Sequence, residues 1–185
     1  MKGYMGKILR VDLTKGRVEV EKLDENQAKK YIGGSGLATK ILYDETGPET
    51  DPLGPENRLI FMTGPFAATP VITSGRHHMV TKSPLTGAYT ESDSGGTWGP
   101  YLKRAGFDGI VVTGKSSKPV YLWVTEGKAE IRDASRFWGV DTYDLDEPVR
   151  KETHNDAVVA SIGPAGEKGV RYASIMNDGK EARAA

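Results

Sequence analysis

Alternating apolar and polar residues at the start of the chain predict a β-hairpin over residues 7–20. Leu9 and Val11 alternate with Arg10 and Asp12, and the alternation resumes after the sequence TKGR. A period of two residues is typical of a strand with one buried face, and a short polar run containing glycine suits the turn between two such strands.

Helix and strand signals follow this hairpin in turn. Asp24 is a predicted helix N-cap, with Gln27 at the spacing of a capping box. The glycine-rich sequence GGSG at 33–36 interrupts the helix, and residues 37–43 predict a second one. An apolar run at 59–63 then predicts a short strand.

The same order of signals recurs later in the chain, where a helix is expected around 146–153. Pro148 is compatible with that helix only in its first turn, because proline lacks the N–H that an interior position donates. The matching signals are the hairpin turns TKGR and TEGK, the strands 59–63 and 158–162 that each end in Gly-Pro, and the arginine-led strands 76–81 and 171–176.

This recurrence predicts an α+β fold built from duplicated hairpin-helix-strand units that form β-sheets. We expect residues 1–185 to form a single domain with internal repeats at roughly 1–84 and 115–180, whose strands share sheets. Residues 85–114, which include a predicted helix at 97–105, would link the two repeats.

Composition narrows the possible functions. Basic and acidic residues number 25 each, so the formal net charge is zero and the basic bias of a nucleic-acid-binding protein is missing. No apolar run approaches the roughly 20 residues of a membrane-spanning helix, and the first residues lack a signal-peptide pattern. The chain has no cysteine, which excludes a thiol nucleophile or a cysteine-bound cluster within it. The expected compartment is the cytoplasm.

The sequence TESDSGGTWG contains the first candidate site, the turn Asp93-Ser94-Gly95 before the predicted helix. Exposed amides at a helix start can hold phosphate, but a nearby carboxylate would repel it. The structural alternative is that Asp93 or Ser94 caps the helix. If phosphate does bind, the Asp93 side chain must point away or a divalent cation must lie between them.

Arginines and histidines supply the other candidates. Arg76 and Arg183 are placed where a guanidinium group could bind phosphate or carboxylate, although surface arginine is the commoner fate. His77 and His78 are adjacent on a predicted strand, so their side chains point to opposite faces and do not easily share one metal. We expect one of them to face the core and the other to be exposed. The glycines of GGSG lack the spacing of a dinucleotide-binding loop.

Several segments, which together cover almost the whole chain, carry a further signal. They are MKGYMGKILRVDLTKG, YIGGSGLATKIL, DPLGPENRLIFMTGPF, TKSPLTGAYTESDSGG, LKRAGFDGIVVTGKSSKPVY, EIRDASRFWG, ASIGPAGEKGVRYASIMNDG and the terminal ARAA. Taken together and in this order, they resemble the N-terminal domain of the tungsten-containing aldehyde ferredoxin oxidoreductases.

The resemblance implies a platform of β-sheets beneath a tungsten (or molybdenum) ion held by two pterins, whose phosphates are bridged by Mg²⁺. By this resemblance Arg76 and Arg183 bind pterin or phosphate groups. The segments Asp93–Gly95 and Arg183-Ala184 contact the cofactor, and the main-chain carbonyls of Asp93 and Ala184 approach the Mg²⁺. It assigns no catalytic residue to this chain.

The resemblance also implies what lies in other parts of such an enzyme. A four-iron, four-sulfur cluster and the proposed acid/base residues belong to later domains, so we expect this chain alone to be inactive. The partners implied are an aldehyde substrate and ferredoxin, and we expect self-association as a dimer. Ser35 stands where the family has arginine in a GGRG-like turn, and Asp93 where it often has asparagine. A non-catalytic module that binds a phosphate-bearing ligand or assists assembly is the alternative.

Overall fold

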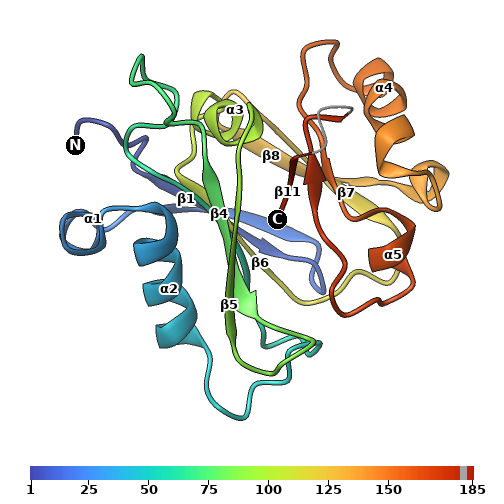
Figure 1. Ribbon diagram of the computed structural model, residues 1–185, viewed down its shortest axis with the longest axis horizontal. Coiled ribbons are helices and arrows are strands. Elements are labelled where there is room, and N and C mark those ends of the chain that lie inside the picture. Colours follow the sequence, from blue (N-terminus) through green and yellow to red (C-terminus); the bar gives the residue numbers. More distant parts are fainter. Residues whose placement is uncertain (180–182) are drawn as a thin grey trace.

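A six-stranded mixed β-sheet lies at the centre of the molecule in the computed structural model, which describes residues 1–179 and 183–185 (Figure 1). Across the sheet the strands are β2 (Arg17–Lys22), β1 (Lys7–Asp12), β6 (Gly109–Thr113), β3 (Leu59–Thr63), β4 (His77–Lys82) and β5 (Tyr89–Ser94). β1 and β6 run parallel, and the other neighbours run antiparallel. The prediction of an α+β fold is therefore confirmed.

Each face of this sheet packs on a different layer. Helices α1 (Glu25–Tyr31) and α2 (Gly34–Glu45) cover one face, where Ile8 packs against α2. Leu9, the next residue of β1, joins the core on the opposite face. That core also includes residues of α3 (Trp98–Arg104) and of the hairpin β7 (Val120–Thr125) and β8 (Lys128–Asp133). Successive residues of β1 therefore pack into two different cores, because neighbouring residues of a strand point to opposite faces.

The remaining elements lie beside the central sheet (Figure 1). They are the 3₁₀ helix η1 (Ser135–Phe137), α4 (Thr142–Glu152), β9 (Ala160–Ser161), α5 (Gly163–Glu167), β10 (Met176–Asn177) and β11 (Arg183–Ala184). The three short strands form a second sheet in the order β11-β10-β9. A third core, centred on Phe137 and Leu145, joins η1 to α4. No helix in the described ranges combines the length and apolar character needed to cross a membrane.

The predicted sharing of sheets between the two repeats is wrong for the described residues. All six strands of the central sheet lie within residues 7–113, while β7 pairs with β8 and the last three strands pair with one another. Residues 85–114 are not a linker, because they contain β5, α3 and β6. β6 lies inside the sheet between β1 and β3, so this segment completes the core.

Several predicted elements are confirmed, but those in the later part differ in their bounds. Asp24 caps α1 by accepting from the Asn26 amide. Helix α4 begins at Thr142, capped by Asp141, so Pro148 lies in the helix interior and not in its first turn. The predicted strands 158–162 and 171–176 reduce to β9 and β10.

A buried ion pair fixes the start of β1 to the rest of the fold. The Asp108 carboxylate accepts hydrogen bonds from the amides of Met5 (3.0 Å) and Gly6 (2.7 Å), and lies 3.4 Å from the Lys103 ammonium. Lys103 also donates to the Gly64 carbonyl at 2.7 Å. Both charged side chains are almost completely buried, and burial lowers the pKa of Lys103, while Asp108 opposes that effect. Removing one partner would leave the other charge buried without compensation.

We expect Asp108→Asn to lower the free energy of unfolding by about 3–5 kcal/mol, because it breaks a buried ion pair from one side. Urea unfolding at neutral pH measures this loss. The double variant Asp108→Asn/Lys103→Met should lose less than the sum of the two single variants, since it leaves no unpaired charge. A single variant as stable as the parent would contradict this role.

Candidate functional site

Asn177 on β10 joins the second sheet to the turn that follows β5. Its Oδ1 accepts a hydrogen bond from Ser94 Oγ (2.5 Å), and its Nδ2 donates to the Gly95 carbonyl (3.1 Å). Asn177 and Ser94 are each 1% exposed. A buried amide with satisfied partners at both ends fixes orientation strongly, because any displacement leaves a polar group unpaired.

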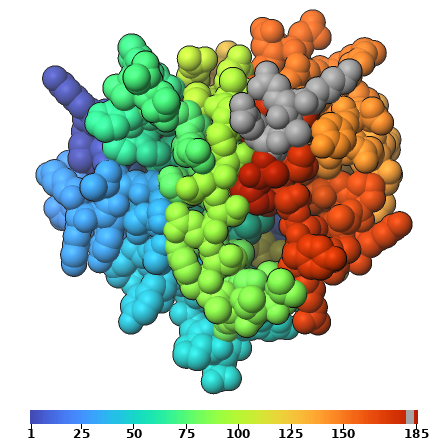
Figure 2. Space-filling model, in the orientation of Figure 1, coloured from blue at the N-terminus to red at the C-terminus, as the bar shows by residue number. Residues whose placement is uncertain are grey.

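This connection brings two of the predicted segments together. Asn177 lies opposite Arg183 in the pairing of β10 with β11, and Met176 lies opposite Ala184. β11 also contacts β5, and Figure 2 shows the red C-terminal segment against the yellow-green segment that contains β5 and its turn. The structure thus places Ser94 and Gly95 near Arg183-Ala184. The Arg183 side chain lies outside the described atoms.

Arg76, the third predicted segment, directly precedes β4 at the same end of the sheet. Its neighbour His77 pairs with Ser94 across the strands. The preceding residue, Gly75, packs so closely on the turn that a Cβ there would lie 2.7 Å from the Gly96 carbonyl oxygen. Arg76 is exposed, and within residues 1–179 and 183–185 its guanidinium has no ion-pair or hydrogen-bond partner. All three predicted segments therefore converge on one end of β4 and β5.

The hypothesis that Asp93 or Ser94 caps the following helix is wrong. Both residues belong to β5, and the N-cap of α3 is Thr97. The carboxylate at this helix start comes from Asp178, which accepts from the Thr97 amide (2.8 Å) and the Thr97 hydroxyl (2.6 Å). The Asp178 carboxylate thus occupies the helix start that the sequence pattern offers to a phosphate.

The Asp93 carboxylate points to its cross-strand neighbour His78, with Oδ1 2.6 Å from His78 Nδ1. The side chain is therefore engaged away from the Asn177 contact. This pairing, like the role of Asn177, was not predicted from the sequence. A polar residue in the short segment MNDG carries no local sign of what it contacts across about eighty residues.

His77 is the member of the histidine pair that faces the core, and His78 is part-exposed, as predicted. The His77 ring packs on Trp98 with centroids 4.6 Å apart. Among the residues that the structure describes, neither of its ring nitrogens has a hydrogen-bond partner. Burial lowers the pKa of His77 to about 4, although Asp178 partly opposes the shift. His77 is therefore neutral beneath the Ser94 turn at neutral pH.

We expect His77 to make the fold sensitive to acid. The unfolded chain binds a proton on His77 below about pH 6.5, whereas the folded chain does so only near pH 4. Stability is therefore lost as the pH falls through this window, by up to about 3 kcal/mol.

Urea unfolding of His77→Phe between pH 7 and pH 4.5 tests this expectation. The phenyl ring keeps the contact with Trp98 and does not titrate, so the loss of stability should be smaller than in the parent. His154→Phe, at an exposed histidine, is the matched control and should follow the parent. Equal pH dependence in His77→Phe and the parent would contradict the assignment.

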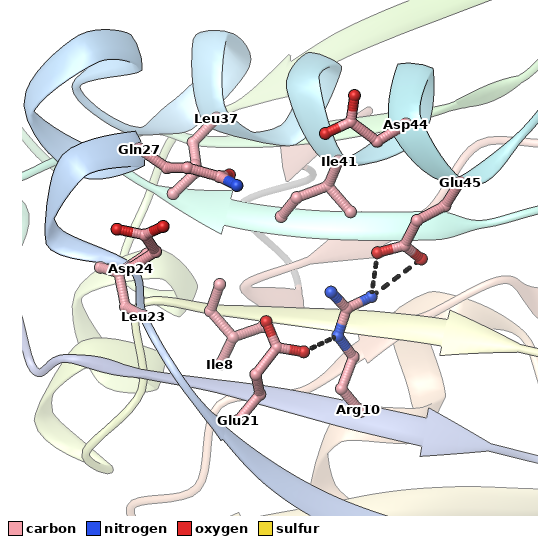
Figure 3. Close-up of a pocket in the computed structure, with 10 residues that line it drawn as sticks. All are labelled: Ile8, Arg10, Glu21, Leu23, Asp24, Gln27, Leu37, Ile41, Asp44 and Glu45. Carbon is pink, nitrogen blue, oxygen red and sulfur yellow. Dashed lines mark hydrogen bonds and ion pairs between the residues drawn. The ribbon is translucent and has the colours of Figure 1, made fainter.

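A separate cavity of about 80 Å³ lies between the β1–β2 hairpin and helices α1 and α2 (Figure 3). Arg10 projects into it and bonds Glu21 (2.6 Å) and Glu45 (2.8 Å), as the dashed lines in Figure 3 show. Its central charges thus satisfy one another, and none of the predicted site residues lines it.

Comparison with known proteins identifies the family of this chain. Residues 8–185 match the family described as aldehyde ferredoxin oxidoreductase, N-terminal domain. The chain is 49% identical over 183 residues to the tungsten-containing aldehyde ferredoxin oxidoreductase of Pyrococcus furiosus, and 49% identical over 183 residues to that of Thermococcus kodakarensis. Each alignment covers 98% of this chain and 30% of the relative, so the chain spans less than a third of their length.

A solved structure has the same fold. It is the active-site complex BamBC of benzoyl coenzyme A reductase with 1,5-dienoyl-CoA, which matches with a TM-score of 0.95 at 41% identity. The match covers 99% of this chain and 28% of that one. On the family match and the identity along nearly its full length, this chain belongs to the aldehyde ferredoxin oxidoreductase family, in which it corresponds to the N-terminal domain.

Proposed function

We propose that this chain is the part of an aldehyde:ferredoxin oxidoreductase that binds a tungsten (or molybdenum) bis-pterin cofactor. The complete enzyme would oxidise aldehydes to carboxylic acids and pass the electrons to ferredoxin. The observation that carries the proposal is the convergence of Arg76, the Ser94-Gly95 turn and Arg183-Ala184 at one end of the sheet. The tungsten-containing relatives support it.

The residues at this place fit an anionic, phosphate-bearing group. Arg76 offers an exposed guanidinium, which binds phosphate oxygens in a planar fork. A Cβ built on Gly95 would meet nothing within 4 Å, so the main chain of the turn faces open space and a ligand can approach it closely. Figure 2 shows the surface hollowed beside this contact, between the green β-strand segment and the red C-terminal segment.

A magnesium ion would offset the negative charge of the phosphate groups. Mg²⁺ prefers hard oxygen ligands such as carbonyls and phosphates, and we assign this role to the main-chain carbonyls of Asp93 and Ala184. The Asp93 side chain is turned to His78, so its carboxylate does not compete with a phosphate for Arg76. This arrangement answers the repulsion expected from a carboxylate beside a phosphate site.

When bound, the cofactor supplies the two-electron redox centre, and the residues of this chain bind and orient it. Asn177 holds the Ser94-Gly95 turn against β10. It thereby fixes the position of this turn relative to Arg183-Ala184, which pair with β10. We assign no catalytic acid or base to this chain. The chain has no cysteine, so the iron–sulfur cluster of the proposed enzyme would belong to a further part. Inactivity of this chain alone, a dimeric assembly and a cytoplasmic location are parts of the same proposal.

Metal analysis of the complete protein encoded with this chain tests the proposal. After expression with tungstate and molybdate, we expect about one tungsten or molybdenum per protomer and aldehyde-dependent reduction of ferredoxin. A purified, folded protein without either metal would contradict the proposal and favour a non-catalytic phosphate-binding or assembly module.

Two variants distinguish the contribution of the Arg76 charge from that of the Asp93 main-chain carbonyl. Arg76→Ala should weaken cofactor retention by about 1.5–3 kcal/mol, because it removes a charge-assisted hydrogen bond. Asp93→Asn should retain the cofactor, since only its carbonyl is assigned to Mg²⁺. Metal content after dialysis measures both.

Arg17→Ala is the matched control, because Arg17 is an exposed arginine on β2 at the opposite edge of the sheet. It should retain metal as the parent does. Unchanged metal content in Arg76→Ala would refute the role of Arg76, and metal loss in Asp93→Asn would show that the carboxylate is needed.

A further inference from the structure

We propose that the side chains of His78, Glu91 and Asp93 bind a divalent transition-metal ion of the Zn²⁺ class. This site would be separate from the pterin contacts, which use the main chain of Asp93. One nitrogen or oxygen ligand atom from each of the three residues lies within 4.8 Å of the other two. Neither the cofactor assignment nor the Mg²⁺ assignment uses these three side chains.

Rigid strands place the three ligands. His78 on β4 and Asp93 on β5 are direct cross-strand partners. Glu91 lies two residues before Asp93 on the same strand, so both carboxylates project from the same face of the sheet. Groups held by paired strands stay close to their binding geometry, which reduces the entropy lost on metal binding.

The distances are close to those of a metal-bound set. Zinc bonds to nitrogen and oxygen are about 2.0–2.2 Å in tetrahedral sites, so neighbouring ligand atoms lie about 3.3 Å apart. His78 Nδ1 is 3.2 Å from Glu91 Oε1 and 2.6 Å from Asp93 Oδ1. The Asp93 carboxylate must retreat from the imidazole nitrogen by less than about 1 Å on this geometry. Its side chain is 40% exposed, which leaves room for that movement.

Hydroxyl groups orient the Glu91 carboxylate. Its Oε2 accepts from Ser35 Oγ (2.6 Å) and from Tyr89 Oη (2.7 Å), and the other oxygen, Oε1, faces His78. The Tyr89 hydroxyl is itself 2.9 Å from Thr39 Oγ1. Supporting hydrogen bonds of this kind fix metal ligands and raise metal affinity.

Gly34 allows the His78 imidazole to pack directly against the start of α2. Gly34, at the start of α2, has a φ of +50°, and a Cβ on it would lie 2.6 Å from His78 Cδ2 and 2.8 Å from Nε2. The ring therefore rests directly on the helix start with Nδ1 turned to the two carboxylates. Any larger residue at position 34 would displace the ring. Close approach to His78 thus explains the glycine at position 34 of the GGSG sequence.

The ligand set selects the class of ion. Imidazole nitrogen suits Zn²⁺ and its transition-metal neighbours, whereas Mg²⁺ and Ca²⁺ prefer sites made of oxygen alone. Two carboxylates balance the charge of a divalent ion. The three side chains are 22–40% exposed, so water can complete the coordination sphere.

Titration of the 185-residue chain, freed of metal by a chelator, tests the site. We expect calorimetry to show one Zn²⁺ per chain and Co²⁺ to give the visible absorption of a bound ion. His78→Asn and Glu91→Gln should each weaken binding about tenfold or more. Ser35→Ala keeps every ligand and removes one support of Glu91, so it should weaken binding by a smaller factor.

His154→Asn is the matched control. His154 is an exposed histidine with one carboxylate, Asp156, 4.0 Å away, and its loss should leave Zn²⁺ binding unchanged. The proposal is overturned by absence of saturable binding, by preference for Mg²⁺ over Zn²⁺, or by undiminished binding in His78→Asn with the fold intact by circular dichroism. No pterin is present in this experiment, so its result is independent of the proposed function.

Discussion

The buried amide of Asn177 is the contact on which the candidate site depends. It accepts from Ser94 and donates to the Gly95 carbonyl, and its strand pairs with β11. One side chain therefore sets the position of the turn after β5 relative to Arg183-Ala184. Because Asn177 and Ser94 are both buried, loss of the hydrogen bond between them would leave polar groups unpaired. This constraint gives the site a fixed geometry before any ligand binds.

The central sheet supplies the rigid base for that contact. Val80 anchors β4 in the core on one face of the sheet, β4 pairs with β5 along its length, and the Asp108–Lys103 pair fixes the chain before β1. His77 lies beneath the Ser94 turn as a neutral ring. Its nitrogens have no hydrogen-bond partner among the described residues, which costs stability, and burial also makes protonation of the ring unfavourable.

Short sequence patterns predict the elements that depend only on residues close together in the chain. The first hairpin, the Asp24 cap and the strand at 59–63 are of this kind. The sequence pattern assigns β6 to a linker, because a run of five residues that begins with glycine does not show that it pairs with β1 and β3. β5 is an edge strand with mostly polar residues, so it lacks apolar alternation.

Contacts between distant residues explain the rest of what sequence reasoning missed. Arg76, Asp93–Gly95 and Arg183-Ala184 were predicted by resemblance, and the structure gathers them at one place. The contacts of Asn177 with Ser94 and of His78 with Glu91 and Asp93 depend on strand register and sheet packing. Register is a property of two strands together, and a single chain pattern does not contain it.

Sheet register and packing thus account for the geometry of the candidate site that we propose binds the cofactor. A crystal structure of the complete protein with its cofactor tests this account most directly. The account predicts pterin phosphates at Arg76 and the Gly95 turn, with Mg²⁺ between the carbonyls of Asp93 and Ala184. A cofactor bound elsewhere, with this end of β4 and β5 left bare, would contradict it.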